Sequence, residues 1–125
     1  MIWAAQLFTL INVGLGLFQL CLAFGAPWGR LAWGGSHERL PPRLRIGSLV
    51  AIGLYAGFSL IILSRAGVIP LWSGAAWTTP ACWIIAGFLT LGIFGNLASR
   101  SRPERLVMTP IAAILAGCAV CVALG

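Results

Sequence analysis

The spacing with the most chemical content lies near the C-terminus, in the tetrapeptide CAVC, where Cys118 and Cys121 form a Cys-x-x-Cys pair. Such a pair can exchange disulfides, because one thiolate attacks while the second thiol resolves the mixed disulfide. The alternative is that both cysteines are small apolar packing residues of a helix. The chain's other cysteines, Cys21 and Cys82, lie in other apolar runs, so no loop cysteine could pass electrons to the pair.

Polar side chains inside apolar runs form the second set of candidates: Asn12, Gln19, Tyr55 and Asn96. A polar group in lipid is costly unless it faces protein or a cavity. Asn12 and Gln19 are seven residues apart and therefore share one face of a helix. These side chains either form hydrogen bonds between helices or line a polar groove for a solute. No carboxylate lies in the middle of an apolar run, which argues against a proton relay built on acids.

The polar segment 25–45, GAPWGRLAWGGSHERLPPRLR, holds half of the arginines, one of the two acids and the only histidine. Its prolines restrict the backbone, its glycines permit tight turns, and its tryptophans suit the depth of lipid head groups. We therefore expect an ordered cap beside the loop near residue 100. In it, Glu38 and Glu104 would each pair with an arginine of the other loop. The alternative is an unstructured loop whose charges only orient the chain.

We expect the remaining arginines to contact the head groups of anionic lipids, which are therefore a predicted partner. The candidates for the cap and for this contact are Trp28, Arg30, Trp33, Glu38, Arg39, Arg43, Arg45, Glu104 and Arg105.

The composition indicates a membrane protein. Mean hydropathy is +1.00 and only 8% of residues are charged, whereas about a quarter are charged in soluble domains. The net charge of +6 comes from arginine alone, and no nucleic-acid-binding motif accompanies it. His37 lacks partners at metal-ligand spacing, and no nucleotide or nucleophile motif occurs. We therefore expect no metal, no cofactor, no catalytic residue and no nucleic acid.

Four apolar runs, at about residues 2–25, 46–64, 80–98 and 102–124, are each near the roughly 20 residues that a membrane span needs. The predicted fold is all-α: a single domain, residues 1–125, forming an antiparallel up-down four-helix transmembrane bundle that could comprise two tandem hairpins. We expect Thr79 and Pro80 to begin the third helix. Ser101 and Glu104 would form a capping box for the fourth, which contains Pro110.

The arginines also predict the orientation. The first and third loops carry seven of them, against Arg65 on the opposite side. The positive-inside rule then places these two loops in the cytoplasm and both termini outside. Four short spans enclose little interior, and Gly53 and Gly57 give the second helix a small-residue face. We therefore expect a homo-oligomer or a membrane partner subunit.

Two stretches, GAPWG…LPPRLR and NLASRSRPER, resemble a group of small four-span bacterial membrane proteins of uncharacterised function. The resemblance covers nearly the whole chain. It implies four helices in a bacterial inner (plasma) membrane, and it implies no activity.

These patterns favour three functions. The first is a transporter- or channel-like protein for an unidentified solute. The second is an accessory or structural subunit of a larger membrane complex, and the third is a membrane thiol oxidoreductase that uses Cys118 and Cys121.

Overall fold

The computed structural model describes all 125 residues and contains four long helices. They are α1 (Ile2–Ala23), α2 (Pro42–Arg65), α3 (Thr78–Leu97) and α4 (Arg102–Leu124), and each is long and apolar enough to cross a membrane. Two short 3-10 turns, η1 (Gly29–Leu31) and η2 (Trp33–Gly35), lie in the first connection.

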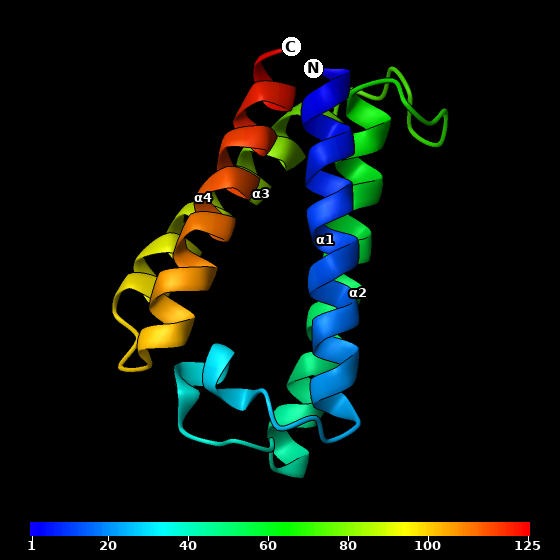
Figure 1. The fold of residues 1–125 in the computed structure, drawn as a ribbon. Helices are drawn as coiled ribbons and strands as arrows, with labels where there is room; N and C mark the ends of the chain where they lie inside the picture. Colours follow the sequence, from blue (N-terminus) through cyan, green and yellow to red (C-terminus); the bar gives the residue numbers. More distant parts are fainter.

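The helices form two antiparallel hairpins, α1 with α2 and α3 with α4, so the predicted all-α bundle is confirmed (Figure 1). Both termini and loop two (residues 66–77) lie at one end of the bundle. Loop one (residues 24–41) and loop three (residues 98–101) lie at the other end, where the hairpins diverge.

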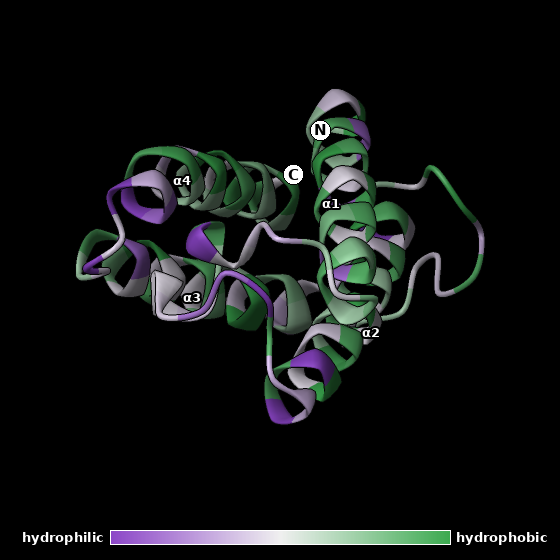
Figure 2. Cartoon of the chain, turned by 60° about the horizontal axis from the view of Figure 1, so that its bottom comes forward, coloured by the Kyte–Doolittle hydropathy of each residue, from purple (hydrophilic) through white to green (hydrophobic).

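The hairpins are packed together in the half of the bundle near the termini. Phe8 of α1, Ile62 of α2, Cys82 of α3 and Ala119 of α4 are all fully buried in one cluster. Several of the remaining members are alanines, which let helix backbones approach closely, as in many membrane bundles. Many large hydrophobic side chains are exposed on the helices, and strongly hydrophilic residues gather toward the end of the bundle that holds loops one and three (Figure 2).

Two helices begin earlier than the sequence predicted. α2 starts at Pro42 instead of residue 46, because a proline fits the first turn of a helix. α3 starts at Thr78 with Trp77 as its N-cap residue, so Thr79 is not the cap. The Thr78 hydroxyl donates a hydrogen bond to the Ala75 carbonyl at 2.8 Å, which stabilises this earlier start. α4 begins at Arg102 as predicted and carries Pro110 inside it.

Candidate solute cavity

A cavity of about 450 Å³ lies between the two hairpins, in the half of the bundle nearest loop one. All four long helices contribute to its walls, and 13 of its 19 lining residues are hydrophobic. Its aromatic members are Phe18, Trp33, Tyr55 and Phe88. The volume falls within the range of about 300–1,000 Å³ that is usual for small-molecule sites, which are also mostly apolar.

Three of the four polar candidates from the apolar runs line this cavity: Gln19, Tyr55 and Asn96. Gln19 is only 8% exposed, its side chain lies near the Tyr55 hydroxyl, and its Oε1 atom has no hydrogen-bond partner. The Asn96 amide donates a long hydrogen bond of 3.4 Å to the Met108 carbonyl. The structure therefore gathers residues of three helices around one space.

The fourth polar candidate, Asn12, does not line the cavity. Its amide nitrogen donates a hydrogen bond to the Ser59 hydroxyl at 3.1 Å, and both residues are buried. This contact joins α1 to α2 within the first hairpin, so Asn12 takes part in helix packing.

Loop one closes the end of the cavity through residues Leu31 to Gly34, and Figure 2 shows the loop crossing the space between the hairpins. The Trp33 ring lies against Gly47 of α2, where an added Cβ would come within 2.8 Å of it. Its indole N–H donates to the buried Ser48 hydroxyl at 3.4 Å. Trp33 therefore packs on α2, although its backbone adopts an unusual φ of 53°.

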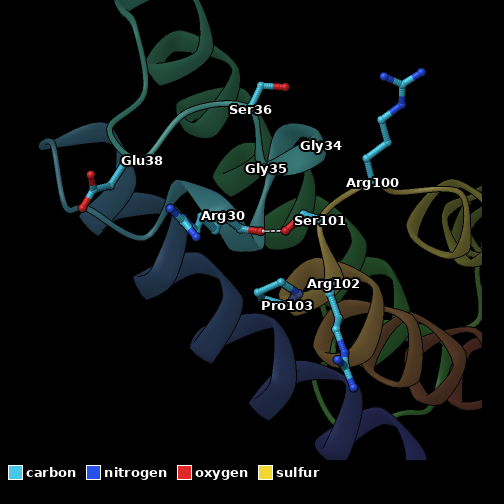
Figure 3. Close-up of a pocket in the computed structure, with 9 residues that line it drawn as sticks. All are labelled: Arg30, Gly34, Gly35, Ser36, Glu38, Arg100, Ser101, Arg102 and Pro103. Carbon is cyan, nitrogen blue, oxygen red and sulfur yellow. Dashed lines mark hydrogen bonds between the residues drawn. The ribbon is translucent and has the colours of Figure 1, made fainter.

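Two hydrogen bonds join loop one to the start of α4. The Ser101 hydroxyl donates to the Arg30 carbonyl (Figure 3), and the Gly34 N–H donates to Glu104 Oε2 at 3.1 Å. The predicted capping box is therefore wrong: Ser101 is the N-cap residue, but its side chain makes no cap bond. The physical reason is that loop one offers both side chains partners of its own.

The predicted ion pairs between loops one and three are also wrong. Glu104 reaches loop one, but its partner is a backbone N–H and not an arginine. Glu38 lies apart from Arg100 across a second cavity of about 440 Å³, which has no hydrophobic residue in its lining (Figure 3).

The guanidinium groups of three arginines donate hydrogen bonds to backbone carbonyls instead. Arg39 donates to the Gly25 carbonyl at 3.0 Å, Arg45 to that of Leu40 at 2.7 Å, and Arg105 to that of Ser99 at 3.1 Å. Loop backbone left without helical partners needs donors, and these arginines supply them.

The remaining head-group candidates lie on the surface at the same end of the bundle. Trp28 is about half exposed, and Arg43 belongs to the first turn of α2. Around the polar cavity, Arg30, Arg100 and Arg102 point in different directions and share no common focus (Figure 3).

The cysteine pair is divided between two environments. Cys118 is buried in the core cluster that also contains Cys82, whereas Cys121 is exposed, and all four thiols are free. No group of three potential metal ligands occurs in the chain.

The contact of Trp33 with Gly47 and Ser48 was not predicted from the sequence. The only signal for it in the sequence is the Gly34-Gly35 pair, which indicates a tight turn next to Trp33.

Four apolar helices in two antiparallel hairpins define a polytopic four-span membrane protein. Comparison with protein-family models, curated proteins and solved structures finds no match to this chain. The four helices that the bacterial resemblance implied are present, while no family is identified.

Proposed function

We propose that this four-span protein is transporter- or channel-like and that the cavity between its hairpins binds a small, mainly apolar solute. The observation that carries the proposal is the mainly apolar cavity itself, whose lining includes the buried side chain of Gln19 with an Oε1 atom that accepts no hydrogen bond. A buried acceptor without a partner costs about 1–3 kcal/mol. A solute that donates a hydrogen bond to this oxygen would recover that cost.

Filling the cavity should abolish binding. Gly92 lines the cavity, and a Cβ added to it would meet no atom within 4 Å, so a larger side chain there would extend into open space. Gly92→Phe should prevent binding of phenylbutanol, a neutral probe with an apolar body and one hydroxyl, measured by calorimetry in lipid nanodiscs. Gly87→Phe is the matched control, because Gly87 is an equally open glycine of α3 outside the cavity. Equal binding by the two variants would refute the proposal.

We further propose a bacterial inner-membrane location with loops one and three in the cytoplasm. The support is charge: seven arginines belong to the end of the bundle that holds these loops, and one, Arg65, belongs to the other end. In this orientation the exposed arginines contact anionic head groups, each contributing roughly 1 kcal/mol.

Reporter fusions test this orientation. Alkaline phosphatase fused after Gly125 should be active, because the C-terminus would be outside, and the same enzyme fused at Ser36 should be inactive. A fluorescent protein that folds only in the cytoplasm provides the complementary control and should show the opposite pattern. Active phosphatase at Ser36 would show that the topology is the reverse of the proposed one.

Association is a separate proposal, and it has one supporting observation. Nothing lies within 4 Å of an added Cβ at Gly53 or Gly57, so this face of α2 is uncovered within the single chain. A second copy or a partner subunit could pack there closely, as small residues allow. Because a partner subunit could pack on this face, an accessory subunit of a larger membrane complex is the second candidate function.

A further inference from the structure

We propose that the cavity selects a positively charged solute, namely an organic ammonium ion with an apolar body. This inference rests on the proposed function, because it names the class of solute that the same cavity would bind.

The first support is a buried carboxylate that has no counter-ion. Glu104 lines the cavity, is only 6% exposed, and accepts its one hydrogen bond from the Gly34 N–H. No arginine or histidine lines the cavity, and the chain contains no lysine. Arg105, the next residue, donates to the Ser99 carbonyl. A buried charge without a counter-ion is costly, so this site favours a ligand that brings the opposite charge.

The position of Glu104 suits a carboxylate. It lies in the first turn of α4, where the helix dipole and free N–H groups favour a negative charge. The Gly34 N–H adds a direct hydrogen bond to the carboxylate. Glu104 therefore places an acidic side chain at the end of the cavity nearest loop one.

The second support is the chemistry of the other lining groups. Gln19 Oε1 is a second acceptor in the lining, so the cavity offers a hydrogen-bond donor two oxygen-bearing side chains, Gln19 and Glu104. Four aromatic rings, those of Phe18, Trp33, Tyr55 and Phe88, line the remaining space. Aromatic faces attract cations as well as apolar bodies. An anionic solute would instead meet the Glu104 side chain, with no arginine among the lining residues to compensate it.

The test compares three probes of one shape and different charge: phenylbutylamine, phenylbutanol and phenylbutyrate. Binding is measured by calorimetry at neutral pH, with the full-length protein in nanodiscs of uncharged lipid. We expect the amine to bind about tenfold more tightly than the alcohol, because both can donate a hydrogen bond to Glu104 but only the ammonium ion also carries the opposite charge. The acid should bind most weakly.

Glu104→Gln isolates the charge, since the glutamine carbonyl can still accept the Gly34 N–H. In this variant the preference for the amine over the alcohol should disappear, and continued binding of the alcohol shows that the cavity is still formed. Glu38→Gln, the same change at the chain's only other acid and outside the cavity, should keep the preference.

Three outcomes decide the matter. An amine preference that is lost only in Glu104→Gln supports the inference. Equal binding of the three probes, blocked by Gly92→Phe, overturns charge selection and leaves the proposed solute cavity standing. Absence of binding by all three probes overturns both proposals.

Discussion

Replacing Gly29 with alanine is expected to open loop one. An added Cβ would collide with the His37 carbonyl oxygen and lie 2.8 Å from that of Glu38, and both are backbone atoms that cannot rotate away. The Gly29 N–H donates to the Glu38 carbonyl at 2.8 Å. The substitution therefore also separates the two segments of loop one that this hydrogen bond joins. We expect the free energy of loop opening to fall by about 2 kcal/mol or more.

Limited trypsin digestion measures this opening. Cleavage after Arg30 and Arg39 follows the population of the open loop, so 2 kcal/mol corresponds to about thirtyfold faster cleavage. Inverted membrane vesicles present the loop to the protease in the proposed orientation. Gly14→Ala is the control, because an added Cβ there meets nothing within 4 Å. Equally rapid cleavage of the unmodified protein would show that loop one is not ordered.

Replacing Phe8 with alanine is expected to weaken the packing between the two hairpins. Phe8 is fully buried in the cluster where residues of all four helices meet. In soluble cores such a change costs about 3–5 kcal/mol. In a membrane the apolar surface exposed on unfolding meets lipid instead of water. The substitution therefore still costs the lost packing contacts, but most of the cost of transfer into water is absent. We therefore expect the free energy of unfolding to fall by about 2–3 kcal/mol.

Reversible unfolding in mixed detergent micelles measures that loss. Leu10→Ala is the matched control on the same helix, because Leu10 is 69% exposed on the outer surface of the bundle and should change the free energy by less than about 0.5 kcal/mol. Similar losses for Phe8→Ala and Leu10→Ala would contradict the proposed packing of α1 against the second hairpin.

The positions of the four helices could be predicted from the sequence because length and hydropathy act locally. Each apolar run is long enough to cross the bilayer, and lipid forces its backbone to form helical hydrogen bonds. The predicted ends lie within four residues of those observed. The two helix starts that differ are Pro42 and Thr78, where the first turn of a helix competes with the preceding loop for the same residues.

The grouping of the polar residues could be predicted only in part. Helical periodicity places Asn12 and Gln19 on one face of α1, yet one donates to Ser59 and the other lines the cavity. Which neighbour each amide meets depends on the angle between the hairpins, because they touch near the termini and diverge toward loop one. No local pattern in the sequence encodes that angle.

The sequence by itself determined the class of protein, the number of spans and the asymmetry of charge, because these depend on composition and on spacing along the chain. Only the tertiary structure decided what the acids do. Sequence spacing predicted that Ser101 would cap α4 with Glu104, and opposite charge predicted ion pairs with arginine. In the folded chain loop one lies against α4, so Glu104 accepts the Gly34 N–H and Ser101 donates to Arg30, while the arginines bind backbone carbonyls. Hydrogen-bond partners are chosen by proximity in space, and residues 34 and 104 become neighbours only when the two hairpins pack together.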